Sequence, residues 1–152
     1  MADINCFVGS VYGAAEQLAN ELVAIAKERG HTLNVHAPGN LKDFHQSDVV
    51  LIITSTTGYG DIPAELESLF IVLQTDFPII KNKRFAVIAM GDSSYVDTFC
   101  YAGKKFQALL TDMHGIELID RLDIDAMANS EPLAQAKSWF DSLLDSLKNE
   151  AH

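Results

Sequence analysis

The chain has 152 residues and a formal net charge of −10 at pH 7, from 21 Asp and Glu against 11 Lys and Arg. That length predicts one domain covering the whole chain, residues 1–152, with enough residues for a proper hydrophobic core. The acidic balance argues against nucleic acid and anionic membranes as partners. It fits attraction to a basic partner surface and, equally well, a role in keeping the protein soluble.

No apolar run approaches the roughly 18 residues that a transmembrane helix needs. The amino end lacks the basic flank of a signal peptide and runs directly into a strand pattern. Cys6 falls in that predicted strand and Cys100 follows a predicted loop, so we interpret both as reduced thiols. Together these features predict a cytoplasmic protein. The five histidines show no ligand spacing with the cysteines, and no metal site is expected.

Strand and helix patterns alternate from the amino end. An apolar run over 4–8 predicts the first strand, and apolar residues at helical spacing between Leu18 and Ala26 predict a helix that Gly30 ends. Residues 32–36 alternate in polarity and predict a second strand. Residues 41–46 are ambiguous, and a short helical turn is one interpretation.

The run Val49–Ile53 has branched apolar residues without polar alternation, which is typical of a central strand buried on both faces. Hydroxyls, two glycines and an acid follow it, and Pro63 stands where a helix would take its first turn. The inward face of that helix is predicted to carry Leu66, Leu69, Phe70 and Leu73.

The carboxyl-terminal half repeats the alternation. Residues 85–90 form another continuous apolar strand pattern, and helical spacing between Phe106 and Met113 predicts the next helix. Residues 116–124 predict a fifth strand, and Pro132 opens a last helix. Trp139 lies at helical spacing in that helix and is interpreted as a packing residue.

Five strands alternating with helices predict an α/β fold. Right-handed crossovers and short connections leave few arrangements, and the commonest five-stranded parallel sheet has the order 2-1-3-4-5 with helices on both faces. Its switch point lies between strands 1 and 3. The loops after Val8 and Ile53 would then flank one crevice, with the loop after Met90 as its other wall.

The loop from Gly9 to Ala15 leads into a predicted helix, whose free N–H groups suit a phosphate. No Gly-Lys-Ser/Thr run follows, so nucleotide hydrolysis is not expected. A plain strand-to-helix turn is the alternative interpretation.

The second loop, Thr54–Pro63, nearly matches the dinucleotide fingerprint, but it has Pro63 where the third glycine belongs and follows the third strand. We therefore reject a nicotinamide Rossmann site. Its flexible backbone suits the edge of a polar planar ring. In the third loop, Tyr95 could stack on a flat aromatic ligand or cap the edge of the core.

Together, Ser10–Ala15, Thr54–Pro63 and Gly91–Gly103 resemble the three FMN-binding loops of the flavodoxin family. The strings Ser55–Pro63 and Gly91–Tyr95 are similar to the flavodoxin-like modules of diflavin reductases. They are also similar to small stand-alone flavodoxin-like proteins of the MioC and YqcA kind. The resemblance covers nearly the whole chain, in order, and implies a single flavodoxin-like domain that binds FMN.

The resemblance also implies roles. The first loop would hold the FMN phosphate with backbone N–H groups, the Ser10 hydroxyl and the helix dipole. Thr56 and Thr57 would lie on one side of the ring and Tyr95 on the other, with the Gly58 carbonyl offered to N5. The implied cofactor-binding residues are Ser10, Val11, Tyr12, Gly13, Ala14, Ala15, Ser55, Thr56, Thr57, Gly58, Tyr59, Gly60, Asp61, Gly91, Asp92, Tyr95, Phe99 and Cys100.

Two positions depart from the family pattern. Tyr12, Ala14 and Ala15 stand where relatives have a hydroxyl-rich Gly-Asn-Thr run, so fewer side-chain donors remain and weaker FMN binding is expected. Thr57 stands at the inner stacking position, where many relatives carry Trp or Tyr, and Tyr59 is two residues away.

The implied function is electron transfer. FMN would supply the redox chemistry while the protein sets its electronics. Asp61, Asp92 and Asp97 would lower its reduction potential, and the acidic surface would steer a basic NADPH-dependent flavin reductase or an acceptor enzyme. No residue is expected to act as a nucleophile or general base. We expect a monomeric electron carrier.

Three alternatives share this fold. An NAD(P)H-dependent flavin or quinone reductase usually carries an extra nicotinamide-binding segment, and the chain shows no such insertion. A receiver-type signalling domain needs acids after strands 1 and 3, where this chain has Gly9-Ser10 and Thr54-Ser55, so it is rejected. An interaction protein with weak or lost FMN binding stays open.

Overall fold

A computed structural model gives the fold and describes residues 2–10, 13–57, 60–128 and 131–150. The strands are β1 (Asp3–Gly9), β2 (Thr32–His36), β3 (Val49–Thr54), β4 (Arg84–Gly91), β5 (Ile116–Glu117) and β6 (Leu122–Asp125). The helices are α1 (Ala14–Glu28), α2 (Leu41–His45), α3 (Ala64–Asp76), α4 (Tyr101–Asp112) and α5 (Pro132–Glu150), with a 3-10 turn at Val96–Thr98.

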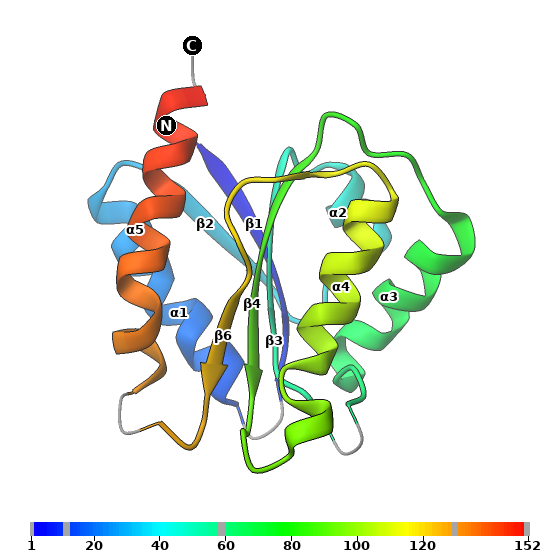
Figure 1. Cartoon of the computed structure of the whole chain (residues 1–152). Helices are drawn as coiled ribbons and strands as arrows, with labels where there is room; N and C mark the ends of the chain where they lie inside the picture. The colour runs from blue at the N-terminus through cyan, green and yellow to red at the C-terminus, as the bar shows by residue number, and fades with distance from the viewer. Residues whose placement is uncertain (1, 11–12, 58–59, 129–130, 151–152) are drawn as a thin grey trace.

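The strands form one parallel sheet in the order β2-β1-β3-β4-β5, and β6 also pairs with β4 (Figure 1). The predicted α/β class and strand order are confirmed. The central strand β3 is buried at every position and pairs with β1 on one side and β4 on the other. Its uninterrupted apolar run is explained by burial on both faces.

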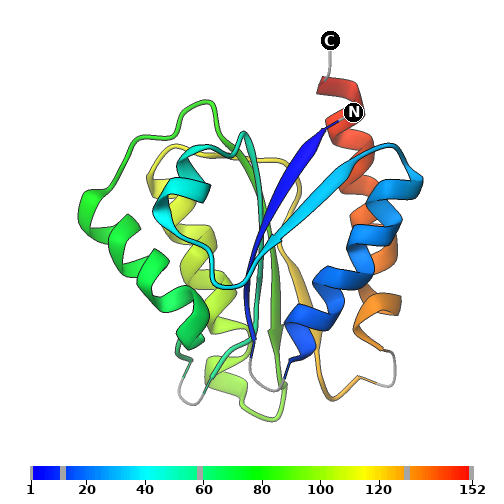
Figure 2. The same ribbon diagram turned by 180° about the vertical axis from the view of Figure 1, so that it is seen from behind.

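Helices cover both faces of the sheet (Figures 1 and 2). Along β3, Val49, Leu51 and Ile53 join the core beneath α1 and α5, whereas Val50 and Ile52 join the core beneath α2, α3 and α4. This alternation follows from the period-2 geometry of a strand. The two cores are therefore filled by alternate residues of the same strands.

The predicted fifth strand over 116–124 is wrong in one respect, because the structure divides it into β5 and β6. β5 pairs with the beginning of β4 and β6 with its end, from Ile88 to Gly91. Between them the chain is tied to its surroundings by other bonds: Trp139 Nε1 donates to the Asp120 carbonyl at 2.8 Å, and Arg121 Nε donates to Asp123 at 2.7 Å. Leu118 N still donates to the Phe85 carbonyl at 2.9 Å, and pairing with β4 resumes at Leu122.

The helix ends agree with the sequence in most places. Gly30, at φ +80°, ends α1 in the left-handed conformation that glycine tolerates. The ambiguous segment 41–46 contains the short helix α2, whose first turn is capped by Asn40 Oδ1 accepting from Asp43 N at 2.8 Å. Pro63 precedes α3 rather than forming its first turn. Phe70, expected inward, is half-buried with its ring 5.0 Å from that of Phe106.

None of the helices in the described part of the chain combines the length and hydropathy needed to cross a bilayer. Both cysteines are buried and unpaired. Among the described residues, no three His, Cys, Asp or Glu side chains gather where they could hold a metal ion.

Candidate cofactor site

Three loops meet at the edge of the sheet where β1, β3 and β4 end, at the bottom of Figure 1. Ser55 N donates to the Gly9 carbonyl at 2.9 Å, which joins the loop after β3 to the end of β1. Ala102 N donates to Thr56 Oγ1 at 3.3 Å, which joins the loop after β3 to the segment after β4. The structure therefore brings together the loops that the sequence predicted to converge.

Ser10 holds the first loop against two different elements. Its hydroxyl accepts a hydrogen bond from Ala15 N, in the first turn of α1, at 3.1 Å. Its own N–H donates to Glu65 Oε1, in the first turn of α3, at 3.3 Å. Gly13 immediately precedes α1 at φ +82°, and a Cβ there would have no heavy atom within 4 Å. The predicted residues Val11 and Tyr12 lie outside the described residues.

The close approach of α3 depends on Gly9. A Cβ at Gly9 would lie 2.8 Å from Leu66 Cδ1 and 3.1 Å from Pro63 Cβ. The missing side chain lets the start of α3 pack on the end of β1. This packing brings the Glu65 carboxylate within hydrogen-bonding distance of Ser10 N.

The second loop turns back on itself between Thr57 and Asp61. Thr57 N donates to the Asp61 carbonyl at 2.9 Å, and Asp61 N donates to the Thr57 carbonyl at 2.8 Å. Gly60 has φ +93°, and a Cβ there would lie 2.5 Å from Tyr101 Cδ2. Glycine is required here both for the backbone conformation and for the approach of the Tyr101 ring. Gly58 and Tyr59, at the tip, lie outside the described residues.

Tyr95 is the most exposed aromatic residue among the described predicted site residues, with 64% of its surface accessible. Its loop is shaped by Asp92, whose Oδ1 accepts from Ser94 N at 2.8 Å. Asp92 and Phe99 are half-buried. The Tyr95 ring can therefore cover a flat ligand without first leaving the core.

Cys100 differs from the other predicted site residues because its thiol is in the interior. Its Sγ lies 3.4 Å from the Ala89 carbonyl oxygen, and burial raises the pKa of the thiol to about 12. A Cβ on Gly91 would lie 2.6 Å from Cys100 N. Any contact of Cys100 with a ligand at the three loops would therefore come from its backbone.

The three loops contain no cationic side chain. Residues 9–15, 54–65 and 91–100 include no Lys, Arg or His, but they include Asp61, Glu65, Asp92 and Asp97. An anion bound here would depend on backbone N–H groups, hydroxyls and the α1 dipole.

The end of β6 is a part of this edge that sequence reasoning missed. Asp125 Oδ1 accepts from Ser93 N at 3.0 Å and from Met127 N at 2.9 Å. Hydrogen bonds from Ser93 and then Met127 lower the pKa of Asp125. Met127 and Tyr101 are 62% and 43% exposed beside the loops. Tyr101 belongs to the third loop that the sequence marked, whereas the position of Asp125 and Met127 depends on how β6 pairs with β4, and no local motif marks it.

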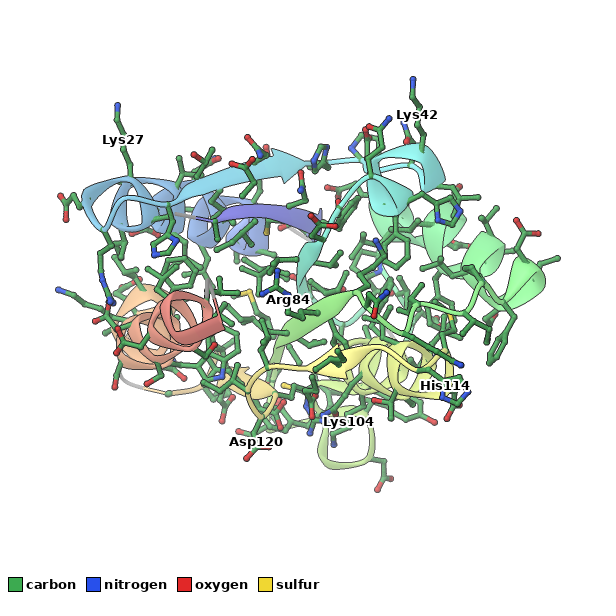
Figure 3. All side chains as sticks on the ribbon, turned by 90° about the horizontal axis from the view of Figure 1, so that it is seen from above. Lys27, Lys42, Arg84, Lys104, His114 and Asp120 are labelled. Carbon is green, nitrogen blue, oxygen red and sulfur yellow. The ribbon has the colours of Figure 1, made fainter. Side chains whose placement is uncertain are left out.

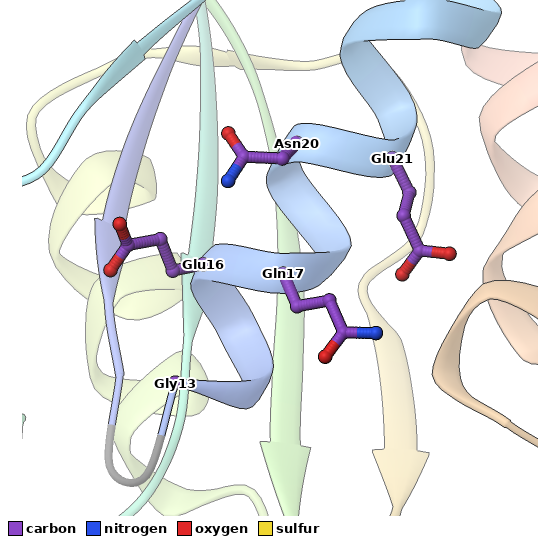
Figure 4. A pocket seen from close by; sticks show the side chains of 5 residues that line it. All are labelled: Gly13, Glu16, Gln17, Asn20 and Glu21. Atoms are coloured by element: carbon purple, nitrogen blue, oxygen red, sulfur yellow. The ribbon is translucent and has the colours of Figure 1, made fainter.

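Two of the surface depressions are lined mainly by residues outside the three loops. One, of about 470 Å³, follows the outer surface of α1 from Gly13 past Glu16 and Glu21 (Figure 4). Its two carboxylates disfavour an anion. The other, of about 490 Å³, lies where the strands begin and includes Asn5 and Arg84, which is labelled in the view from above in Figure 3.

A doubly wound parallel sheet whose polar loops meet at the switch point defines an α/β protein that binds its ligand at the strands' carboxyl ends. The comparisons with known proteins give the family. The family model described as Flavodoxin matches residues 6–139.

The chain is similar in sequence to its relatives along nearly its full length. The chain is 40% identical over 143 residues to Flavodoxin YqcA of Escherichia coli K12, covering 93% of this chain and 95% of that protein. It is 36% identical over 149 residues to Protein MioC of the same strain, covering 97% and 100%. The structure of a point mutant of flavodoxin from Pseudomonas aeruginosa has a TM-score of 0.89 at 28% identity, covering 96% and 99%.

The chain belongs to the flavodoxin family. It is a small flavodoxin similar to the MioC and YqcA proteins, and its family binds FMN and transfers electrons to partner proteins.

Proposed function

We propose that FMN lies across the three loops at the carboxyl edge and that the protein carries electrons from an NADPH-dependent flavin reductase to an acceptor enzyme. The observation that carries the proposal is the pair of hydrogen bonds that joins the loops, Ser55 N to Gly9 O and Ala102 N to Thr56 Oγ1. These bonds hold three separate chain segments in one arrangement before a ligand arrives. FMN supplies the redox chemistry when bound.

At the phosphate end, Ser10, Gly13, Ala14 and Ala15 would hold the phosphate, together with Val11 and Tyr12. The open space at Gly13 and the amino end of α1 support this assignment. Ala14 and Ala15 offer no side-chain donor, which supports the expectation of weaker FMN binding than in relatives with hydroxyl-rich loops.

At the ring end, Thr56 and Thr57 would lie against one side and Tyr95 against the other. The half-buried position of Thr57 and the exposure of Tyr95 support these roles. Gly60 and Gly91 let the Tyr101 ring and the Cys100 backbone pack closely against the loops, which fixes the loops at this end. The carboxylates of Asp61 and Asp92 would disfavour added negative charge on the ring.

Partner proteins would dock over the same edge. Tyr95, Tyr101 and Met127 are exposed there, and the carboxylates of Asp61 and Asp97 are exposed beside them. Lys105 Nζ lies 4.9 Å from the centroid of the Tyr101 ring, so the acids border this apolar rim mainly on the side of Asp61 and Asp97. Such a rim suits a partner with a basic, partly apolar surface. We infer a brief complex between a cytoplasmic monomer and each partner in turn.

An FMN titration of the cofactor-free protein tests the site, with riboflavin and FAD as controls. Saturable changes in visible absorbance and flavin fluorescence, with FMN preferred over riboflavin, are expected because only FMN offers a terminal phosphate to the first loop. Binding without preference for FMN would contradict the phosphate assignment and favour an interaction protein.

A charge reversal tests the docking surface. Asp97→Lys should slow reduction by a basic NADPH-dependent flavoprotein reductase about tenfold at low salt, with the difference shrinking at high salt. Asp112→Lys makes the same charge change at the carboxyl end of α4 and should leave the rate near that of the wild type. Equal rates for both variants at every ionic strength would contradict the acidic docking surface.

A further inference from the structure

A carboxylate contacts the loop that is assigned to the FMN phosphate. Glu65 Oε1 accepts a hydrogen bond from Ser10 N at 3.3 Å across 55 positions of sequence. Ser10 is the first residue of that loop, and its hydroxyl is already an acceptor for Ala15 N at 3.1 Å. The Ser10 amide, one of the N–H groups proposed for the phosphate, is thus paired with a negative charge of the protein itself.

The contact is built into the packing of α3. Gly9 lets Pro63 and Leu66 approach the end of β1, and Leu66 is fully buried. Glu65 precedes Leu66 and is half-buried, whereas Glu67, two residues further along the same turn, is exposed. Helix geometry therefore directs one of these two acids at the loop and the other toward solvent.

Electrostatics oppose a second anion at this amide. A phosphate monoester carries close to two negative charges at neutral pH. The three loops contain no Lys, Arg or His that could offset it. Either the Glu65 carboxylate leaves Ser10 N when the phosphate arrives, or it stays nearby as a like charge. Both cases cost binding free energy that a ligand without a phosphate does not lose.

We propose that Glu65 is a specificity-determining residue that competes with the FMN phosphate for the Ser10 amide and thereby limits the preference for FMN over riboflavin. This inference rests on the proposed binding of FMN across the three loops. In the absence of cofactor, the same carboxylate stabilises the start of the loop by accepting the Ser10 hydrogen bond.

Two substitutions separate competition from positioning. Glu65→Gln keeps a hydrogen-bond acceptor and removes the charge, and Glu65→Ala removes both. Competition predicts that each variant binds FMN about tenfold more tightly than the wild type, which is about 1.4 kcal/mol, with riboflavin affinity unchanged. A positioning role predicts a different result. Glu65→Ala would weaken FMN binding, and Glu65→Gln would leave FMN affinity unchanged.

Glu67→Gln is the matched control, because it makes the same charge change in the same turn of α3 on an exposed side chain. It should leave the ratio of FMN to riboflavin affinity at the wild-type value. A second readout needs no flavin: inorganic phosphate should raise the melting temperature of cofactor-free Glu65→Gln at lower concentrations than for Glu67→Gln.

The outcomes separate this inference from the proposed function. If all four proteins bind FMN with the same preference over riboflavin, the flavin site stands and the role of Glu65 is overturned. If none of them prefers FMN to riboflavin, the phosphate assignment and the role of Glu65 fail together. A gain in FMN affinity confined to the two Glu65 variants supports both.

Discussion

The two edges of the sheet use different side chains to satisfy their backbone groups. At the amino edge, Lys83 Nζ donates to the carbonyl oxygens of Phe44, at 2.9 Å, and Ser47, and it lies 5.0 Å from the centroid of the Phe44 ring. Arg84 N donates to the Asp48 carbonyl at 3.0 Å. A long cationic side chain thus ties α2 and the chain before β3 to the start of β4.

At the carboxyl edge, the hydroxyls and carboxylates of short side chains accept hydrogen bonds from the backbone. Ser10 Oγ and Thr56 Oγ1 accept from backbone N–H groups, and Asp125 Oδ1 accepts from Ser93 N. The loops of this edge contain no cationic side chain. Tyr95 remains 64% exposed above them.

The difference shows how one fold separates stability from binding. Short acceptors fix the loops at the carboxyl edge, whereas a single long side chain bridges separate chain segments at the amino edge. Substitutions at the amino edge should therefore affect unfolding, and substitutions at the carboxyl edge should also affect FMN. The contrast can be tested at four positions, beginning with the largest expected effect.

The reactivity of Cys100 tests whether the loops at the carboxyl edge keep reagents away from the side chains buried beneath them. The raised pKa of about 12 compared with an ordinary 9.0 leaves about a thousandfold less thiolate at neutral pH, and the side chain is fully buried. In Cys6→Ala, which leaves this thiol alone, we expect reaction with a disulfide reagent only after unfolding in urea. Fast reaction of the native protein would mean that the loop over Cys100 opens readily.

Lys83→Met should destabilise the protein by about 2 kcal/mol, because two carbonyl groups lose a charged donor. FMN affinity should stay at the wild-type value, since the change is at the other edge of the sheet. Urea unfolding and an FMN titration measure the two quantities. Lys81→Met alters an exposed lysine nearby and should change stability by no more than about 0.5 kcal/mol. Loss of FMN affinity in Lys83→Met would contradict the separation of the edges.

Thr56→Val should reduce stability by about 1 kcal/mol and also weaken FMN binding, because Ala102 N loses its acceptor and the second and third loops are no longer joined. Thr75→Val is the control: its hydroxyl donates to Ile71 O at 2.8 Å on the exposed face of α3, far from the loops in sequence. Matching FMN affinities for the two variants would contradict a role of the Thr56 bond in the site.

Asp125→Asn should have the smallest effect, and the effect should depend on pH. Hydrogen bonds from Ser93 and Met127 lower the pKa of Asp125 below its ordinary 3.8 in the folded protein. The unfolded state therefore binds more protons near pH 3.8, so this stabilisation is present above that pH and is lost as the pH falls through the folded pKa. Wild type should exceed the variant in urea midpoint at pH 7, with the gap closing in acid. A gap independent of pH would contradict this.

Much of the fold was determined by local sequence. The run Val49–Ile53 predicts a strand buried on both faces because it has no polar alternation. The period of apolar residues in 106–113 and after Pro132 predicts helices, because burial repeats every 3.6 residues in a helix with one face against the core. The polar loops were found for the same reason: they follow apolar runs whose carboxyl ends must share one edge of a parallel sheet.

Only the tertiary structure decided which distant groups meet. The bond between Ser10 and Glu65 spans 55 positions, and it depends on how closely α3 packs at Gly9. The division of 116–124 into β5 and β6 depends on contacts with α4 and α5, and the interior position of the Cys100 thiol depends on β4 and β6. Such contacts are set by interatomic distances across the packed core, and a local pattern of residues does not encode those distances.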